Sequence, residues 1–326
     1  MAITDFQAKY IAYELTRRYP SDHVEKLASA LVDARVDLNP HQVDAALFAF
    51  RSPLSRGALL ADEVGLGKTI EAGLVLAQRW AERRHRILVI TPANLRKQWH
   101  QELSEKFFLP CHILEAKSYN AARKAGDPAP FTADAVVICS YEFARGKEAE
   151  VRATPWDLVV VDEAHRLRNV YKPANVTANA LKRALAGRHK LLLTATPLQN
   201  SLLELYGLVS VIDEHTFGDL ASFREQFANL HHERTFETLR ARLRRICHRT
   251  LRRQVTAYVP YTERRAILED FTPEKAEARQ RGDDGHAQEA PRALRRRRPR
   301  QAARARGGVE ALARPLRAPA DAAHTA

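Results

Sequence analysis

The stretch ALLADEVGLGKTIEAG, residues 58–73, is the most informative segment of the sequence. It begins with a run of four apolar residues, ALLA (58–61), which is typical of a buried strand. It leads into an amphipathic stretch at 69–83, which is typical of a helix. Between them, Gly65 and Gly67 allow the backbone to curl so that its N–H groups point inward. The segment therefore predicts an anion-binding nest between a strand and the N-terminus of a helix.

The connection is interpreted as a phosphate-binding loop. Lys68 would reach the β- and γ-phosphates of a nucleotide, and the hydroxyl of Thr69 would bind Mg²⁺. The usual pattern has glycine where this sequence has Asp62, so the match is incomplete. Such a string also occurs in ordinary glycine turns, but its place between a strand and a helix favours phosphate binding. The predicted nucleotide-binding loop comprises Asp62, Glu63, Val64, Gly65, Leu66, Gly67, Lys68 and Thr69.

Short apolar runs recur along the next part of the chain, and amphipathic stretches separate most of them. Runs that are apolar at every position suit strands buried on both faces, and their alternation with helices predicts an α/β fold with a parallel, doubly wound sheet. Ligands bind such sheets at the carboxyl ends of the strands. The runs are ILVI (87–90), AVVIC (135–139), LVVV (158–161) and LLL (191–193), with amphipathic stretches at 94–107 and 175–186.

The run LVVV is followed directly by Asp162-Glu163-Ala164-His165. In the predicted architecture these carboxylates would lie beside the phosphate loop, with Asp162 holding Mg²⁺ through water and Glu163 polarising the attacking water. The alternative is a polar strand-to-helix turn in which Asp162 caps the helix. Because the pair follows both an apolar strand and the loop at 62–69, the catalytic interpretation is favoured.

Two further segments contribute weaker signals. In LLLTATPLQN (191–200), Thr194 and Thr196 could sense the γ-phosphate, or they could belong to a threonine-rich turn ahead of Pro197. In LNPHQ (38–42), the amide of Gln42 could pair with the adenine edge. A single glutamine is by itself better explained as a surface residue.

Six segments in this order resemble motifs of superfamily 2 ATPases. The combination of GLGKTIEAG with TATPLQN is similar to the bacterial RapA-like branch of the Swi/Snf group, which also has Asp in the place of the usual loop glycine. LRRQVTAYVP and the residues after it, 251–273, resemble the segment with which that group leaves its first lobe. The six segments, which resemble the adenine motif and motifs I, Ia, Ib, II and III, are 38–42, 62–73, 89–102, 138–144, 162–165 and 191–200.

The resemblance implies a RecA-like lobe that binds ATP and Mg²⁺. Carried over, Gln42 reads adenine, Lys68 and Thr69 bind phosphate and metal, and the catalytic residues are Lys68, Asp162 and Glu163. Mg²⁺ would be bound by Thr69 and Asp162. The resemblance gives His165, Thr194 and Thr196 the role of coupling nucleotide state to DNA, and makes Asn94, Lys97, Gln98 and Ser140 candidates for the DNA backbone, although exposed polar residues at helix starts are usually just solvated.

The resemblance also implies a function, namely ATP-dependent translocation on double-stranded DNA that remodels a DNA-bound complex such as RNA polymerase. In the family, ATP lies between two RecA-like lobes, and the second supplies arginines that stabilise the transferring phosphate. Two alternatives are an unwinding helicase or motor subunit of a restriction or defence complex, and a noncatalytic ATP- and DNA-binding module that acts through a partner.

The chain divides into four parts by pattern. We expect a helical N-terminal extension (1–38), the ATP-binding lobe (39–215), a helical remainder with the exit segment (216–273) and a disordered basic tail (274–326). The tail is rich in Ala, Arg, Pro and Gly, and holds 13 basic against 7 acidic residues. It is either a nucleic-acid-binding arm or, as we favour, the product of a frameshift or truncation that removes the second lobe.

Composition is consistent with a nucleic-acid partner. The formal net charge of the 326 residues is +13, which favours a polyanion but is weak evidence alone. The three cysteines, at 111, 139 and 247, fit neither a disulfide framework nor a zinc site. The sequence shows no secretory signal and no stretch apolar enough for a membrane span, so we expect a soluble cytoplasmic protein.

Overall fold

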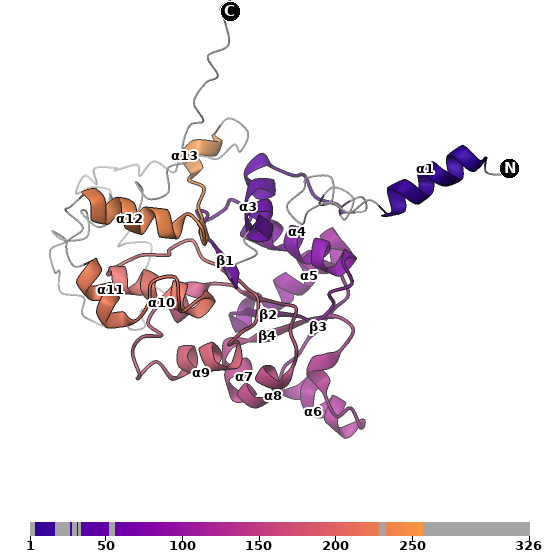
Figure 1. Cartoon of the computed structure of the whole chain (residues 1–326). Coiled ribbons are helices and arrows are strands. Elements are labelled where there is room, and N and C mark those ends of the chain that lie inside the picture. The colour runs from indigo at the N-terminus through magenta and orange to yellow at the C-terminus, as the bar shows by residue number, and fades with distance from the viewer. Residues whose placement is uncertain are drawn as a thin grey trace, which may run out of the picture.

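The computed structural model describes residues 4–16, 27, 31, 34–51, 56–227 and 233–256 (Figure 1). Its centre is a seven-stranded sheet in the order β3-β4-β2-β5-β6-β1-β7, and every adjacent pair of strands is parallel. The strands are β1 (Gly57–Leu60), β2 (Ile87–Thr91), β3 (Cys111–Ile113), β4 (Val136–Ser140), β5 (Leu158–Val161), β6 (Lys190–Leu193) and β7 (Cys247–His248).

Helices cover both faces of the sheet (Figure 1). The α-helices of the described residues are α1 (Asp5–Thr16), α3 (Pro40–Arg51), α4 (Lys68–Ala81), α5 (Arg96–Phe107), α6 (Ala116–Lys124), α7 (Tyr141–Gly146), α8 (Glu148–Ala153), α9 (Val176–Ala184), α10 (Leu202–Ile212), α11 (Leu220–Gln226), α12 (Glu233–Leu243) and α13 (Arg252–Val255). Short 3₁₀ helices lie at η1 (Ala93–Leu95), η2 (Pro130–Thr132) and η3 (Ala164–Leu167).

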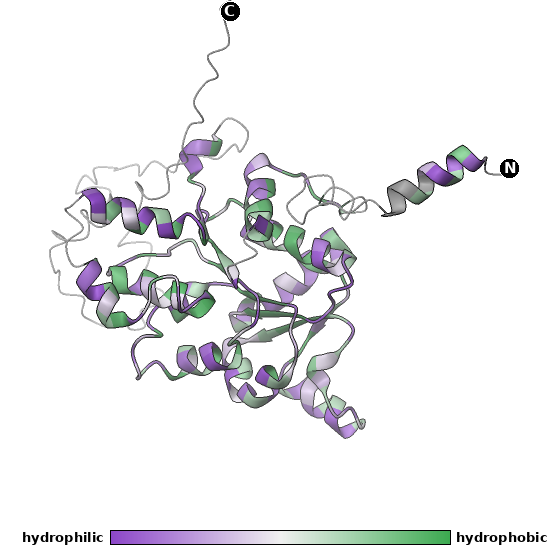
Figure 2. Cartoon of the chain, viewed as in Figure 1, coloured by the Kyte–Doolittle hydropathy of each residue, from purple (hydrophilic) through white to green (hydrophobic). Residues whose placement is uncertain are grey.

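Successive residues of each central strand enter two different hydrophobic cores. In β1, Leu59 packs with α7 to α12, whereas Ala58 and Leu60 pack with α3, α4 and α5. The two-residue period of a strand sends alternate side chains to opposite faces, so a strand with helices on both sides must be apolar throughout. Figure 2 shows this pattern as green strands beneath helices whose faces alternate between green and purple.

The predicted architecture is confirmed. The five apolar runs form β1, β2, β4, β5 and β6, and the amphipathic stretches between them form α4, α5 and α9. The two edge strands were not predicted: β3 has three residues and includes His112, and β7 has two residues. The expected helical remainder, 216–273, is not helical throughout, because α12 ends at Leu243 and the chain then joins the sheet as β7. Its last part, 257–273, lies outside the described residues.

The ends of the chain are described only in part. Helix α1 lies in the expected N-terminal extension, and most of the rest of that extension lies outside the described residues. The expected tail, 274–326, also lies outside them. Within the part that is described, the three cysteines are free, no group of metal-ligating side chains is found, and no helix is long and apolar enough to span a membrane.

Helix α4 carries an acidic side chain into the protein interior. Glu71 is fully buried on the face that packs against the sheet, together with Leu74 and Val75. Burial and, second, the nearby carboxylate of Asp62 raise the pKa of Glu71 to about 9. The carboxyl of Glu71 is therefore protonated in the folded protein at neutral pH, although it is ionised in the unfolded chain.

This difference makes stability depend on pH. Between the unfolded pKa, near 4.5, and the folded pKa, about 9, the folded state keeps a proton that the unfolded state has lost, so the free energy of unfolding falls as pH rises. Glu71→Gln, a neutral substitution of similar size, removes this contribution. We expect the free energy of unfolding of the variant, relative to that of the parent, to increase as pH is raised from 5.5 to 8.5, measured by urea unfolding. Glu105→Gln, at an exposed position of α5, is the control, and equal pH dependence in parent and Glu71→Gln would contradict the assignment.

Candidate nucleotide-binding site

The predicted site residues follow three neighbouring strands. They lie at the edge of the sheet that is formed by the carboxyl ends of its strands. The loop 62–67 follows β1, Asp162 and Glu163 follow β5, and Thr194 follows β6, which lies between them. The strand ends are level, because Leu60 pairs with Leu193 and Val161 pairs with Leu192. With adjacent strands about 4.8 Å apart, the ends of β1 and β5 are separated by roughly 10 Å. The sheet thus brings residues 100 positions apart in the chain to a single edge.

The loop has the backbone conformation expected of an anion nest. Gly65 and Gly67 have φ values of 85° and 89°, in the left-handed region that favours glycine. A Cβ atom on Gly67 would lie 2.4 Å from Nε2 of Gln42, so a side chain at this position would displace that amide from the loop. Gly67 is also the residue before α4, and no side chain caps the first N–H groups of that helix. Backbone N–H groups at the start of α4 are therefore available to an anion.

Lys68 supplies the positive charge of the loop. Its Nζ donates to the carbonyl oxygens of Asp62 at 2.9 Å and Glu63 at 3.2 Å, so the ammonium group lies across the loop and is held by the loop's own backbone. Thr69 follows on the first turn of α4 and is half-buried. A glycine-lined nest with one lysine and one hydroxyl fits the phosphates of a nucleotide with Mg²⁺.

The start of α3 packs against the same loop. Gln42 is 5% exposed, and its Nε2 donates to the carbonyl of Leu66 at 3.1 Å while its Oε1 accepts from the N–H of Asn39 at 3.2 Å. His41 is also buried, with Nε2 2.9 Å from the same Leu66 oxygen. The interpretation of Gln42 as a surface residue is wrong, because its side chain is a buried part of the wall that supports the phosphate loop.

Asp162 is held by residues from β2 and α5. Its Oδ2 accepts from Thr91 Oγ1 at 3.0 Å and from Trp99 Nε1 at 2.8 Å, and its Oδ1 accepts from the N–H of Glu163 at 2.9 Å. The hydroxyl of Tyr141 donates to the Asp162 carbonyl at 2.5 Å. Sequence reasoning did not assign these roles to Thr91, Trp99 and Tyr141. Thr91 and Trp99 fix the orientation of the carboxylate, and Tyr141 holds the backbone of the same residue.

Glu163 lies at a sharp turn of the backbone. Its φ of 51° is unusual for a residue other than glycine, and it is the residue before the 3₁₀ helix η3. The carboxylate is part-exposed, and its Oε2 lies 3.0 Å from Nδ1 of His165. Glu163 therefore adopts a backbone conformation that costs free energy. The turn it makes just after β5 places its carboxylate where the strands of the sheet end.

The residues after β6 are linked to those after β5. Thr194 is fully buried and its Oγ1 accepts from the N–H of Thr196, whose side chain is exposed. Arg168 Nη1 donates to Gln199 Oε1 at 2.6 Å, and the buried Glu204 lies 3.7 Å from Arg168 Nε. The sequence analysis did not predict this connection. It joins the segment that follows Asp162–His165 to the segment that follows Thr194–Pro197.

The four candidate DNA contacts occupy different environments. Asn94, Lys97 and Gln98 are exposed, and Gln98 donates to Glu102 one turn further along α5. Ser140 is buried and its Oγ caps α7 by accepting from the N–H of Phe143 at 3.1 Å. Ser140 therefore has a structural role as a helix cap, which does not depend on contact with DNA.

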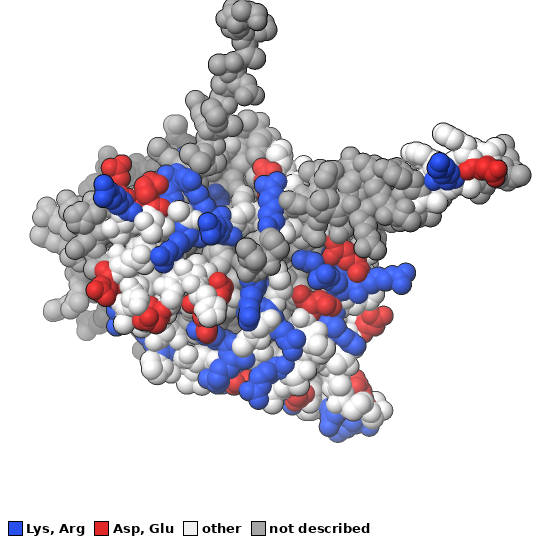
Figure 3. Space-filling view, in the orientation of Figure 1, with Lys and Arg blue, Asp and Glu red and all other residues white. Residues whose placement is uncertain are grey.

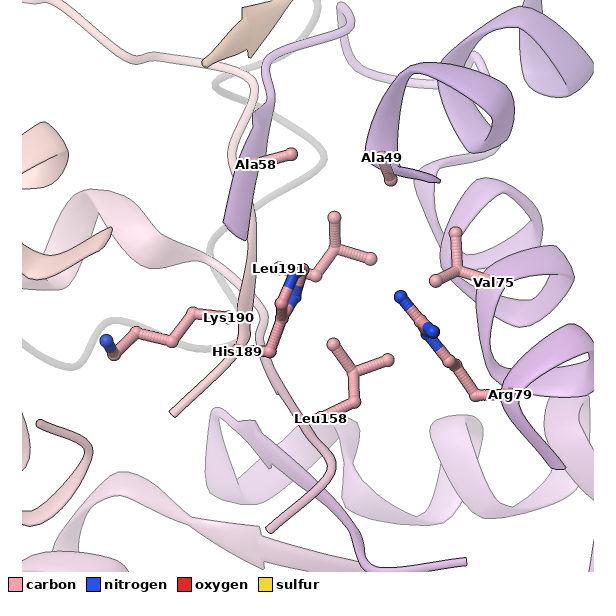
Figure 4. Close-up of a pocket in the computed structure, with 8 residues that line it drawn as sticks. All are labelled: Ala49, Ala58, Val75, Arg79, Leu158, His189, Lys190 and Leu191. Carbon is pink, nitrogen blue, oxygen red and sulfur yellow. The ribbon is translucent and has the colours of Figure 1, made fainter. Parts of the chain in front are cut away.

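A small pocket lies at the opposite end of the strands (Figure 4). It opens near the starts of β1, β5 and β6, and the guanidinium of Arg79 and the ring of His189 lie in it (Figure 4). Burial and, second, Arg79 lower the pKa of His189 to about 4, so its ring is neutral at physiological pH. Since none of the candidate site residues lines the pocket, it is separate from the nucleotide-binding edge.

Comparisons with known proteins agree with this site. The RNA polymerase-associated protein RapA of Cronobacter sakazakii is 36% identical over 219 residues, which are 65% of this chain and 22% of that protein. The uncharacterized ATP-dependent helicase YqhH of Bacillus subtilis is 38% identical over 193 residues, which are 58% of this chain and 32% of that protein. The chain thus matches only a fifth to a third of these curated relatives.

A solved structure shows the same fold. The SWI2/SNF2 ATPase core of Sulfolobus solfataricus, in complex with dsDNA, matches with a TM-score of 0.58 at 23% identity, over 67% of this chain and 45% of that chain. A family model for the SNF2-related domain matches residues 22–313. The order of the motifs, the parallel sheet and the loop geometry all agree with that match, and the protein belongs to the SNF2-related domain family.

Proposed function

We propose that this chain is the ATP-binding lobe of a motor that couples ATP hydrolysis to translocation on double-stranded DNA. The observation that carries the proposal is the placement of a glycine-rich nest with Lys68 after β1, level with Asp162 and Glu163 after β5. Membership in the SNF2-related family supports ATP as the nucleotide. An acidic pair facing a phosphate nest is the arrangement that phosphoryl transfer to water requires.

Each residue of the edge has a proposed task. Backbone N–H groups of residues 65–68 bind phosphate oxygens, and Lys68 exchanges its loop carbonyls for the phosphates. Gln42 lies at the loop and is proposed to face the adenine. Thr69 and Asp162 would hold Mg²⁺, which when bound neutralises charge on the phosphates. Glu163 is proposed to orient the attacking water, with His165 against its carboxylate.

The DNA partner is proposed from the relatives. The Sulfolobus solfataricus core is in complex with dsDNA, and the name of RapA describes a protein associated with RNA polymerase. We propose duplex DNA as the track and a DNA-bound complex such as RNA polymerase as the object of remodelling. On the face in Figure 3, Lys and Arg side chains form several clusters with acidic side chains between them, so on this face DNA would meet separate basic clusters rather than one continuous basic surface.

The lobe that the structure describes forms one wall of such a site. We expect a polypeptide of residues 1–326 to bind Mg·ATP but to hydrolyse it slowly, with little stimulation by duplex DNA. Adding a second RecA-like lobe of the family in trans should raise DNA-stimulated phosphate release at least about tenfold, because arginines from such a lobe stabilise the transferring phosphate and are worth about 10³–10⁵ in related enzymes. The second lobe alone is the control. Robust DNA-stimulated hydrolysis by residues 1–326 without it would contradict the one-wall account.

The role of Glu163 can be separated from nucleotide binding. Glu163→Gln keeps the size of the side chain and its reach to His165, but an amide cannot polarise water well. We expect affinity for Mg·ATP within about twofold of the parent and loss of hydrolysis in the presence of the second lobe, by at least about a hundredfold. Affinity is measured with a fluorescent nucleotide and hydrolysis by phosphate release. A Glu163→Gln protein that hydrolyses ATP like the parent would show that this carboxylate has another role.

A further inference from the structure

The chain that leaves β7 runs directly beside the phosphate loop. Pairing between β7 and β1 continues past the strand ends, because the N–H of Ala61 donates to the His248 carbonyl at 2.8 Å and the N–H of Glu63 donates to the Thr250 carbonyl at 3.2 Å. The N–H of Thr250 donates to Oδ1 of the buried Asp62 at 2.7 Å. A segment almost 190 positions later in the sequence therefore forms one side of the loop.

Arg252 completes this contact at the tip of the loop. Its backbone N–H donates to Glu63 Oε2 at 2.7 Å, and its guanidinium donates to the Val64 carbonyl through Nε at 2.9 Å and also through Nη2. A Cβ atom built on Gly65 would lie 3.1 Å from Nη2, which places the guanidinium over that glycine. One exposed arginine thus contacts three successive residues at the start of the nest.

These contacts fix the direction of a peptide group that the nest depends on. The carbonyl of Val64 and the N–H of Gly65 belong to the same planar peptide, so binding the carbonyl on one side turns the N–H toward the other. A nest binds anions only when its successive N–H groups converge. The glycines at 65 and 67 leave this backbone free to adopt other conformations, and Arg252 restricts that freedom from outside the loop.

We propose that Arg252 is a positioning residue for the phosphate loop, which it holds in the conformation that binds nucleotide through the Val64 carbonyl and the Glu63 carboxylate. The inference rests on the proposed function, since it assigns Arg252 to the same nucleotide site. It differs from a direct phosphate contact because the guanidinium acts on the loop before any nucleotide arrives.

The test uses the full chain with three substitutions. Arg252→Gln removes the charged donors, Arg252→Lys keeps the charge but loses the two-pronged contact, and Arg253→Gln removes a charge from the neighbouring exposed position. We expect Arg252→Gln to weaken binding of a fluorescent Mg·ATP analogue about tenfold, as for one charge-assisted hydrogen bond. Arg252→Lys should show a smaller loss, and Arg253→Gln should bind like the parent.

A second measurement does not require nucleotide. Hydrogen exchange of the amides in residues 63–68 should be faster in nucleotide-free Arg252→Gln than in the parent, with the thermal midpoint nearly unchanged. Equal exchange and equal affinity in Arg252→Gln and the parent would overturn the inference, as would an equal loss of affinity in Arg253→Gln. If Arg252→Gln does not fold, Arg252→Lys decides by the same two measurements. A parent that binds no Mg·ATP would refute the proposed function instead, and the exchange measurement would still judge the role of Arg252.

Discussion

The parallel pairing of β5, β6, β1 and β7 is the constraint on which the rest of this structure depends. Because the four strands point the same way and end at the same level, residues 62–69, 162–165, 194–196 and 248–252 meet at one edge of the sheet. Parallel strands require long crossovers, which here are helices on both faces, and those helices supply the two hydrophobic cores. Burial of apolar side chains therefore stabilises the fold. It also fixes the spacing of polar groups that no local interaction could bring together.

Each polar group at that edge is held by a second residue from another part of the chain. Asp162 is oriented by Trp99 and Thr91, and Asp62 accepts the Thr250 N–H where the usual loop has glycine. Burial costs a carboxylate its hydration, and these hydrogen bonds compensate for part of that loss. Burial keeps Glu71 protonated, and Asp62 adds to this effect, since two ionised carboxylates close together in the interior would repel each other.

The sequence was sufficient for the fold and for the residues that follow strands, and insufficient for contacts between distant segments. Apolar runs such as LVVV predict a buried strand because every position is apolar, and Lys68 is recognisable because glycines precede it. By contrast, β7 has two residues in a basic stretch whose pattern is also typical of a helix. It is a strand because it pairs with β1. From the sequence, Trp99 is indistinguishable from an ordinary core residue. Only the structure shows that it donates a hydrogen bond to Asp162. No local pattern predicts the contact of Arg252 with the phosphate loop, because its partners lie about 190 positions earlier in the sequence.

The central claim is that residues 62–69 form the phosphate site, and titration calorimetry of Mg·ATP with Lys68→Ala tests it most directly. The substitution removes the ammonium group that lies across the loop, while the helix and strand on either side keep their packing. The account predicts heat of binding for the parent and for Lys97→Ala, a surface control on α5, and no measurable binding for a folded Lys68→Ala protein. Unchanged affinity in folded Lys68→Ala would contradict it.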